Sequence, residues 1–261
     1  MKVLLVGRGG REHALAWKIN QSNLLTELFI APGNTGTASV GTNIDINEMD
    51  TEGLLRFAVS RDVELTIVGP EAPLAAGIVD RFSDNNRAIF GPKAGPAKLE
   101  SSKSFAKSIM RKWNIPTANA NIFHDPEQAA KHLTQISTYP TVIKADGLAS
   151  GKGVYICNDE VQAHQAVKDL MIDRIFGDAG KLILIEEFLR GRELSVFTFT
   201  DGINISPIIA ACDHKRIGEG DTGLNTGGMG AFSPPQFWSA SLENEISERT
   251  KTRRHFMSHV L

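Results

Sequence analysis

A glycine-rich stretch with two lysines, Lys144-Ala-Asp-Gly-Leu-Ala-Ser-Gly-Lys-Gly-Val154, constrains this chain more than any other feature. It lies between two β-branched runs, Thr141–Ile143 and Val154–Ile156, which predict two strands joined by a turn. Glycine lets the backbone turn several N–H groups toward one anion, and lysine adds positive charge. The stretch therefore predicts a loop for a polyphosphate, with an ordinary glycine-rich hairpin carrying exposed lysines as the alternative. It is not a P-loop, because one residue too few separates its glycines and no Ser or Thr follows Lys152.

Length and charge limit the classes of function. At about 150 residues per domain, 261 residues leave room for two domains. A formal net charge of −2 gives no electrostatic reason to expect binding to nucleic acid or to an acidic membrane. No apolar run is long enough for a signal peptide or a membrane span, so we expect a cytoplasmic protein. Cys157 and Cys212 lie in or beside apolar runs, which predicts buried free thiols.

The first 100 residues predict a parallel α/β sheet, because short apolar runs alternate with helical patterns. The expected strands are Lys2–Val6, Leu28–Ala31, Glu64–Val68 and Ala88–Phe90, and the expected helices are Ala14–Ile19 and Thr51–Ser60. Ligands of open α/β sheets gather beyond the carboxyl ends of the strands. We therefore expect Gly9, Glu71 and Pro92, which each follow a strand, to face one crevice.

The turn after the first strand, Gly7-Arg-Gly-Gly-Arg-Glu12, differs from the dinucleotide fingerprint. Glu12 stands where the third glycine belongs, so NAD or FAD is not expected. Gly9 and Gly10 at a helix start still suit a phosphate or a sugar, and a tight turn without a ligand is the alternative. Glu71 also has two interpretations: it binds ribose hydroxyls, or it caps a helix that begins near Ala72.

From about residue 101 the strands and helices no longer alternate strictly, which predicts an α+β unit. One expected helix begins at Ser101 and stops before Ile115. A second follows the N-cap Asp125, with Pro126 as its first residue, and ends near Ile136, and a third spans roughly Glu160–Met171. Beyond the strand pair already described, expected strands are Leu182–Ile185, Leu194–Phe199 and, as the last clear one, Ile205–Ala211, with a turn at Asp201-Gly202.

Two polar segments follow strands of this second unit. Glu186–Leu189 offers backbone groups for an adenine edge and Glu193 a carboxylate for ribose hydroxyls, although glutamates at strand ends are usually solvated. The second segment comprises Asp213–Arg216 and Asn225–Gly230. Its glycines and charges are typical of a functional loop, with a disordered surface loop as the alternative.

Five motifs, in this order, resemble the phosphoribosylamine–glycine ligase (glycinamide ribonucleotide synthetase) family of the ATP-grasp superfamily. They are Gly9–Trp17, Gly69–Leu74, Lys144–Val154, Asp213–Arg216 and Asn225–Ala231, and the resemblance runs from Met1 to about Pro234. It implies a Rossmann-like (pre-ATP-grasp) domain at 1–100 and an α+β ATP-grasp domain at 101–261, with a lid subdomain at about 120–190. It also implies ATP-dependent ligation of glycine to 5-phosphoribosylamine through a glycyl phosphate, which yields glycinamide ribonucleotide, ADP and phosphate in purine biosynthesis.

The resemblance further implies roles for individual residues. The implied ATP-binding residues are Lys103 and Lys144 for the phosphates, Gly147, Ser150, Gly151, Lys152 and Gly153 in a lid loop, Glu186, Phe188 and Leu189 for adenine, and Glu193 for ribose. The residues implied to bind substrate are Gly9, Gly10 and Glu71, which would face phosphoribosylamine, and Thr226 and Gly228, which would line the junction where its amine meets activated glycine. Those implied at the reacting centre are Asp213, Lys215, Asn225 and Gly227.

Family members are longer than this chain, and the resemblance fades after about Pro235. The family's Glu-x-Asn segment for Mg²⁺ or Mn²⁺ does not occur in the sequence, so no residue is assigned as a metal ligand. We therefore expect an incomplete, C-terminally truncated ATP-grasp domain, and a monomer. A catalytically silent ATP-binding fragment and a different ATP-grasp carboxylate–amine ligase are the alternatives.

Overall fold

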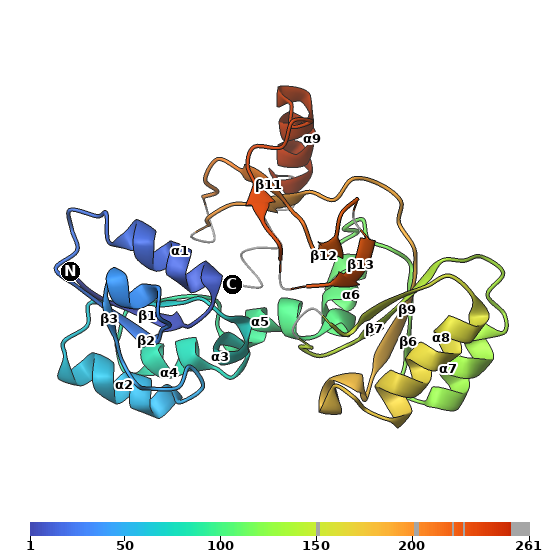
Figure 1. Ribbon diagram of the computed structural model, residues 1–261, viewed down its shortest axis with the longest axis horizontal. Helices are drawn as coiled ribbons and strands as arrows, with labels where there is room; N and C mark the ends of the chain where they lie inside the picture. The colour runs from blue at the N-terminus through green and yellow to red at the C-terminus, as the bar shows by residue number, and fades with distance from the viewer. Residues whose placement is uncertain (150–151, 201–203, 221, 227, 252–261) are drawn as a thin grey trace. The chain divides into compact units, whose positions relative to one another are not determined.

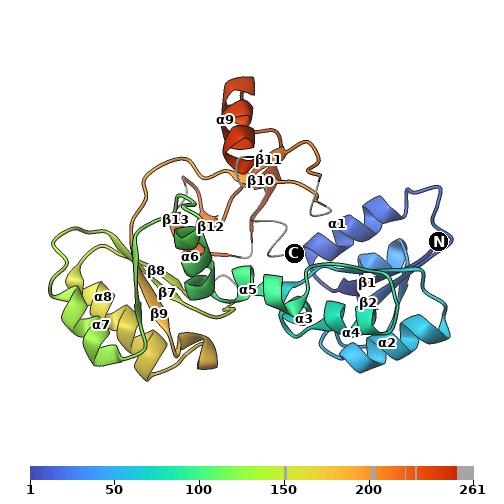
Figure 2. The same cartoon turned by 180° about the vertical axis from the view of Figure 1, so that it is seen from behind.

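The computed structural model describes residues 1–149, 152–200, 204–220, 222–226 and 228–251. They form two compact units, Met1–Ser101 and the part of the chain from Ser102 onward (Figures 1 and 2). Each unit has buried hydrophobic clusters of its own. None of the described helices is both long and apolar enough to cross a membrane.

A five-stranded parallel sheet, ordered β3-β2-β1-β4-β5, forms the centre of the first unit. Its strands are β1 (Lys2–Gly7), β2 (Glu27–Pro32), β3 (Thr42–Asn43), β4 (Leu65–Val68) and β5 (Ile89–Phe90). The helices are α1 (Gly10–Ile19), α2 (Thr51–Ser60), α3 (Glu71–Ala75), α4 (Ile78–Asp84) and α5 (Ala94–Ser101), with a 3-10 turn η1 (Thr37–Ser39). The parallel sheet predicted from the sequence is confirmed.

Side chains of β1 enter two separate cores because successive residues of a strand point to opposite faces. Leu4 and Val6 pack in the core that includes buried residues of α2 and α4. Val3 and Leu5 pack on the other face with Ala16 of α1. Both faces of the sheet are thus covered, which explains why the strands are apolar throughout.

A four-stranded antiparallel sheet, ordered β6-β9-β7-β8 and called here the β6–β9 sheet, lies in the second unit. Its strands are β6 (Ala120–Phe123), β7 (Thr141–Ala145), β8 (Val154–Cys157) and β9 (Ile183–Glu187). Helices α7 (Pro126–Leu133) and α8 (Glu160–Val167) cover one face, burying Ile143 and Ile185 (Figures 1 and 2). Helix α6 (Lys103–Lys112), the π-helical η2 (Lys168–Ile172) and the 3-10 turn η3 (Gly177–Gly180) complete this part.

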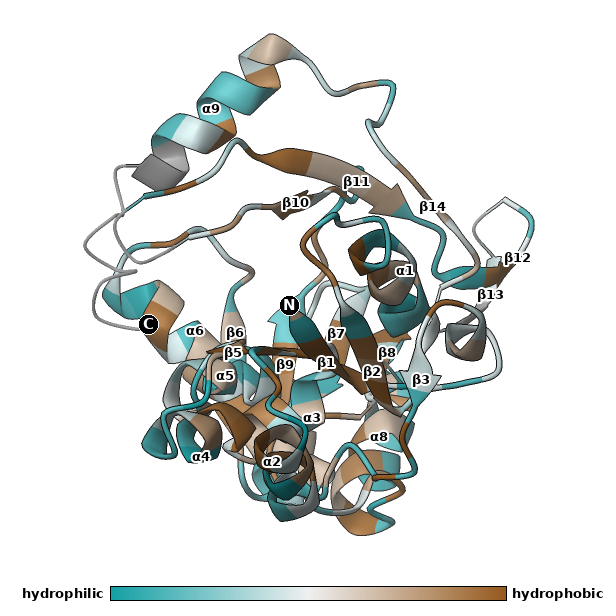
Figure 3. Cartoon of the chain, turned by 90° about the vertical axis from the view of Figure 1, so that its left-hand side faces the viewer, coloured by the Kyte–Doolittle hydropathy of each residue, from teal (hydrophilic) through white to brown (hydrophobic). Residues whose placement is uncertain are grey.

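The rest of the second unit contains shorter strands. β10 (Ser195–Phe197), β11 (Ile209–Asp213) and β14 (Ala231–Phe232) form an antiparallel sheet, and β12 (Arg216–Gly218) pairs with β13 (Thr222–Asn225). Helix α9 spans Ala240–Lys251. Figure 3 shows β11 as mainly hydrophobic, and because the strand ends at Asp213 its carboxyl end is polar.

Some predicted helix boundaries are wrong. The helix expected to start at Ser101 begins at Lys103, because Ser102 leaves the helical conformation and its hydroxyl accepts a hydrogen bond from Phe105 N at 3.2 Å. The residues before it form α5, which was not predicted. Helix α7 ends at Leu133 instead of near Ile136, and the helix expected through Met171 changes at Lys168 into η2.

Predicted strands also differ from the observed ones. β9 continues through Glu187, so the two glutamates belong to the strand and do not follow it. β11 begins only at Ile209, and it is not the last strand, because β12, β13 and β14 come after it. The turn expected at Asp201-Gly202 lies outside the described residues.

Candidate functional site

Lys144 lies on the face of the β6–β9 sheet that is opposite to α7 and α8. It pairs across the strands with Leu184, and Glu186 is the next β9 residue on the same face. Lys144 Nζ lies 2.9 Å from Glu186 Oε2, and Lys107 Nζ of α6 lies 3.4 Å from Glu186 Oε1. These three residues, called here the lysine–glutamate cluster, carry two positive charges and one negative charge.

Burial differs sharply within the lysine–glutamate cluster. The Glu186 side chain is 4% exposed and that of Lys107 is 9% exposed, whereas that of Lys144 is 29% exposed. Lys107 Nζ also donates to Thr117 Oγ1 and to the Ala118 carbonyl, each at 2.7 Å. The buried charges thus have the partners that burial demands, and Lys144 is the member that solvent reaches. Glu186 is therefore not solvated, unlike most glutamates at strand ends.

The predicted phosphate loop starts where β7 ends. At its first residue, Asp146, the loop is hydrogen-bonded to the start of α6. Asp146 Oδ1 accepts from Ser104 N at 2.5 Å, and Oδ2 accepts from Ser102 Oγ at 3.0 Å. Lys103 Nζ donates to the Gly147 carbonyl at 3.1 Å. The start of the loop and the start of α6 are thus hydrogen-bonded to each other, which holds Lys103 beside the loop.

The predicted strand pair around this loop is confirmed by the antiparallel register of β7 and β8. Ser150 and Gly151 lie outside the described residues. Beyond them, Lys152 N donates to the Ala149 carbonyl at 2.9 Å, and the Lys152 side chain is exposed. A Cβ on Gly153 would lie 2.7 Å from that of Ala149, so the loop closes too tightly here for a larger residue.

The residues predicted to bind adenine follow the end of β9. Phe188 is half-buried and Leu189 is exposed. A pocket of about 390 Å³ at this end of the sheet is lined by Glu187, Phe188, Asn121 and His132, among others. Asn121 contacts His132 of α7 at 3.2 Å, so this pocket extends over the helix-covered face. Glu186 and Phe188, two of the residues predicted to bind adenine, line the pocket, but neither lysine predicted to bind phosphates does.

Asp213, Lys215 and Glu193 form a second group of charges. Lys215 Nζ contacts Glu193 Oε1 and lies 3.6 Å from Asp213 Oδ1. Burial lowers the pKa of Lys215, but the hydrogen bond to Glu193 and the charges of both carboxylates outweigh burial and raise this pKa above its ordinary value. The structure thus brings together two residues predicted at the reacting centre and one predicted to bind ribose.

Residues predicted near that centre are anchored beside Lys215. Thr226 N and Oγ1 donate to the Lys215 carbonyl at 2.6 and 2.8 Å, and Gly228 N donates to Thr226 Oγ1 at 3.0 Å. Asn225 ends β13, but its side chain and the whole of Gly227 lie outside the described residues.

In the first unit, Glu12 occupies the inside of the glycine turn. Its Oε2 accepts from Gly9 N at 2.6 Å, and the side chain is almost completely buried. Gly7 has φ of +131°, and a Cβ there would lie 2.4 Å from Glu12 Cγ, so only glycine fits. Gly10 is the exposed first residue of α1. The glutamate that replaces the fingerprint's third glycine therefore fills the turn itself.

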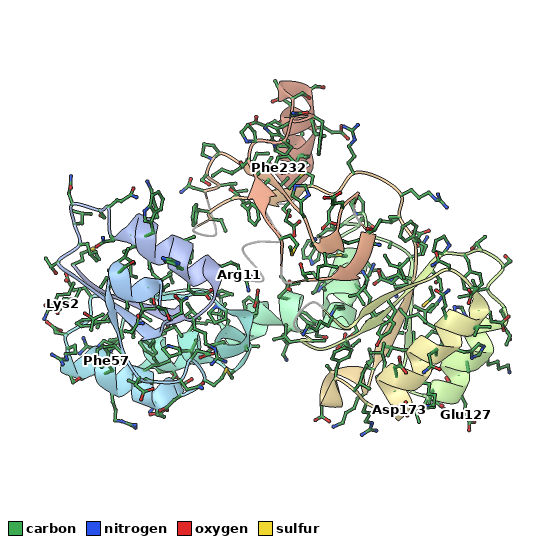
Figure 4. All side chains as sticks on the ribbon, in the orientation of Figure 1. Lys2, Arg11, Phe57, Glu127, Asp173 and Phe232 are labelled. Carbon is green, nitrogen blue, oxygen red and sulfur yellow. The ribbon has the colours of Figure 1, made fainter. Side chains whose placement is uncertain are left out.

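Glu71 binds Arg11, which is labelled in Figure 4. Arg11 Nη1 and Nη2 donate to the two Glu71 carboxylate oxygens at 2.8 and 3.4 Å. Burial raises the pKa of Glu71, but the hydrogen bond and charge of Arg11, together with a backbone hydrogen bond, outweigh burial, and the net pKa is below the ordinary value. Helix α3 begins at Glu71 itself, so the expectation that Glu71 caps a helix beginning near Ala72 is wrong. Its binding of ribose stays a prediction.

Two residues of the site in the second unit were missed by sequence reasoning. Asp146 stands inside the predicted loop but was given no role. Lys107 has the appearance of a solvated lysine on an amphipathic helix. Its spacing could have indicated a role in the site, because Lys107 stands four residues after Lys103 and so lies on the same side of α6.

Both units match models of known protein domains. Residues 1–100 match the N domain of phosphoribosylglycinamide synthetase, and residues 101–254 match its ATP-grasp (A) domain. The phosphoribosylamine–glycine ligase of Yersinia pestis is 51% identical over 236 residues, which is 90% of this chain and 55% of the relative. That of Clostridium acetobutylicum is 46% identical over 254 residues, which is 96% of this chain and 61% of the relative. The chain thus spans little more than half the length of these curated relatives.

Solved structures show the same fold. The crystal structure of phosphoribosylamine–glycine ligase from Thermotoga maritima matches with a TM-score of 0.78 and 30% identity, covering 100% of this chain and 60% of that one. The biotin carboxylase domain of Hydrogenobacter thermophilus 2-oxoglutarate carboxylase, solved with MgADP, matches at 0.73 with 17% identity over 98% of this chain and 58% of its own, which shows a shared fold alone. Because the two family matches together account for residues 1–254, the chain belongs to the phosphoribosylglycinamide synthetase family.

Proposed function

We propose that the second unit binds ATP on the sheet face that carries Lys144. The supporting observation is the lysine–glutamate cluster, whose excess positive charge reaches solvent at Lys144, three residues before Gly147, the first glycine of the loop. Lys103 also lies near the start of the loop, where its ammonium group donates a hydrogen bond to the Gly147 carbonyl. Lysine ammonium groups and loop N–H groups are the means by which proteins bind polyphosphates.

The rest of the nucleotide extends from this point in the proposed complex. The loop from Gly147 to Gly153 closes over the phosphates and excludes water. The backbone of Glu186, with Phe188 and Leu189, contacts adenine, and Glu193 accepts hydrogen bonds from the ribose. Since Glu193 contacts Lys215, ribose binding and the predicted reacting centre share one charged group.

The reaction that we propose for the complete ligase joins glycine to 5-phosphoribosylamine. The glycine carboxylate attacks the γ-phosphorus of ATP and releases ADP. The amine of phosphoribosylamine then displaces phosphate from the glycyl carbon and gives glycinamide ribonucleotide. The names of the curated relatives and the matched family domains support this assignment.

In this proposal the chain's own residues position the reactants and stabilise charge, because no covalent nucleophile is needed. Lys215, kept protonated by Glu193 and Asp213, supplies positive charge at the proposed reacting centre. Asn225 and Gly227 stay predicted members of that centre. The substrate contacts of Gly9, Gly10 and Glu71 in the first unit, and those of Thr226 and Gly228 in the second unit, stay predictions. The monomeric state and the cytoplasmic location stay predictions.

A divalent cation, Mg²⁺ or Mn²⁺, normally bridges the phosphates of ATP during phosphoryl transfer. Among the described residues, no three His, Cys, Asp or Glu side chains are grouped so that they could hold a metal ion. We therefore assign no residue of the described chain to that ion.

Calorimetric titration with Mg·ATP and an assay of ADP release test the proposal together. For this chain we expect saturable binding with a stoichiometry of about one. ADP release that requires both glycine and phosphoribosylamine is the result expected of the complete ligase. Binding without ADP release would indicate a silent ATP-binding fragment. ADP release with a different acid and amine would indicate another ATP-grasp ligase, and no binding at saturating nucleotide would overturn the proposal.

A further inference from the structure

Lys107 is a buried cation that the proposed mode of ATP binding does not use. An ammonium group has three donors, and Lys107 Nζ has three partners: Thr117 Oγ1, the Ala118 carbonyl and Glu186 Oε1. With 9% of its side chain exposed, it has neither a spare donor nor a path to a ligand. Its role must therefore be exerted through Glu186.

The charges of the lysine–glutamate cluster show what that role is. If Glu186 had Lys144 as its only counter-ion, the two charges would cancel, and Lys144 would offer little net attraction to a phosphate. Lys107 neutralises the same carboxylate from the buried side. The single excess positive charge of the cluster is then carried by Lys144, the exposed member.

We propose that Lys107 is a positioning residue, whose charge offsets that of Glu186 so that Lys144 is free to bind the anionic part of the nucleotide. This inference rests on the proposed binding of ATP to the second unit. Because the cluster is largely shielded from water, the effect of one missing charge is not screened away as it is at a surface.

The inference predicts a loss of affinity that depends on ligand charge. Without the Lys107 charge, the attraction of the site for a triphosphate weakens, whereas an uncharged nucleoside loses nothing. If the role of Lys107 were merely structural, its loss would instead distort the segment predicted to bind adenine. The affinities for adenosine and for ATP would then fall by the same factor. The ratio of the two affinities within one variant therefore distinguishes these roles.

The experiment measures the dissociation constants of adenosine, AMP and a nonhydrolysable ATP analogue for the whole chain by calorimetry. Lys107→Met removes the charge and keeps the length of the side chain. We expect it to raise the dissociation constant of the ATP analogue by about 10-fold, that of AMP by less, and that of adenosine by less than about 2-fold. Lys112→Met, on the same helix at an exposed position, is the matched control and should change none of the three.

A second substitution should restore the affinity that Lys107→Met loses. In the double variant Lys107→Met/Glu186→Gln, Lys144 again carries one uncompensated positive charge, so we expect most of the lost affinity for the ATP analogue to return. A structural role predicts that the double variant binds no better than Lys107→Met. If Lys107→Met does not fold, the variant Glu186→Gln alone is measured. It should bind the ATP analogue more tightly relative to adenosine, and the absence of this gain would overturn the inference.

The outcomes separate this inference from the proposed function. Equal losses for adenosine and the ATP analogue in Lys107→Met, or no loss at all, would overturn the inference while the unsubstituted chain still binds ATP. Failure of the unsubstituted chain to bind the analogue would overturn the proposed function and the inference with it.

Discussion

Glu186 and Glu187 are neighbours in sequence and have opposite environments. Successive residues of a strand point to opposite faces, so a single position decides whether a carboxylate joins a buried cluster or meets solvent. Glu186 contacts two ammonium groups, whereas the exposed Glu187 accepts a hydrogen bond from Asn119 N at 2.8 Å. Lys144 lies on the same face as Glu186, which is why its ammonium group reaches that carboxylate.

The first prediction concerns Lys144. Lys144→Met should weaken binding of Mg·ATP by roughly 1.5–3 kcal/mol, the usual contribution of a charge-assisted hydrogen bond to a phosphate. Calorimetric titration measures the change. Lys131→Met, at an exposed position of α7, is the control and should leave the dissociation constant unaltered. An unchanged dissociation constant for Lys144→Met would remove this lysine from the phosphate site.

The second prediction concerns the two free cysteines. Burial, together with the negative charge of Asp159, raises the pKa of the Cys157 thiol to about 11. At pH 8 that thiol is about 0.1% ionised, and only the thiolate reacts with alkylating agents. We therefore expect iodoacetamide to modify the partly exposed Cys212 and to spare Cys157 until the protein is unfolded in urea. Peptide mapping by mass spectrometry measures both reactions.

The same pKa gives the sign of a pH effect on stability. An unfolded chain ionises Cys157 near pH 9, two pH units before the folded chain does, so the unfolded state loses its proton first. The free energy of unfolding should therefore fall between about pH 9 and pH 11 and not below that range. Modification of native Cys157 as fast as Cys212 at pH 8 would contradict this account.

At the scale of elements, helix α2 could be predicted with its observed bounds because its signals are local. Asp50 caps it by accepting from Gly53 N at 2.9 Å, and its buried side chains follow the helical period. Strands β12 and β14 could not be predicted, since each has two or three residues and no period of its own. Pairing with another strand creates them, and that pairing is not a local property.

The candidate site likewise contains residues that local sequence signals could predict and residues that only tertiary packing brings together. Glycine and lysine composition pointed to the loop and to Lys144, because a phosphate loop is built from consecutive residues. Lys107 could not be found in this way. Its function depends on Glu186, far away in the sequence, and only the packing of α6 against the β6–β9 sheet brings the two together.

The third prediction compares two aspartates that accept hydrogen bonds at the start of a helix. Asp146 and Asp125 each accept hydrogen bonds at the start of a helix, Asp146 from Ser104 N of α6 and Asp125 from Glu127 N of α7. Replacing either by Ala should destabilise the protein by about 1 kcal/mol, measured as the midpoint of urea unfolding. Only Asp146→Ala should also weaken ATP binding, because Asp146 fixes the phosphate loop to the helix that carries Lys103. Equal effects of both substitutions on ATP binding would contradict that coupling.

At the scale of the whole molecule, the chain contains two sets of buried hydrophobic clusters that share no residue. The clusters of Met1–Ser101 surround the parallel sheet, and that of the second unit lies between the β6–β9 sheet and its helices. The residues that we propose for ATP binding all belong to the second unit. Nucleotide should therefore stabilise one unit directly and the other only through any coupling between them.

The fourth prediction follows from this separation and uses differential scanning calorimetry. Ile78 and Ile183 are both fully buried, one in each unit. Ile78→Val and Ile183→Val should each cost about 1 kcal/mol and lower different unfolding transitions, by roughly 4–8 °C for the smaller unit and 2–4 °C for the larger. An ATP analogue at about 100 times its dissociation constant adds about 2.7 kcal/mol to the stability of the unit that binds it. That ligand should raise only the transition that Ile183→Val lowers. A single transition, shifted alike by both substitutions and by nucleotide, would show that the two units unfold together despite their separate cores.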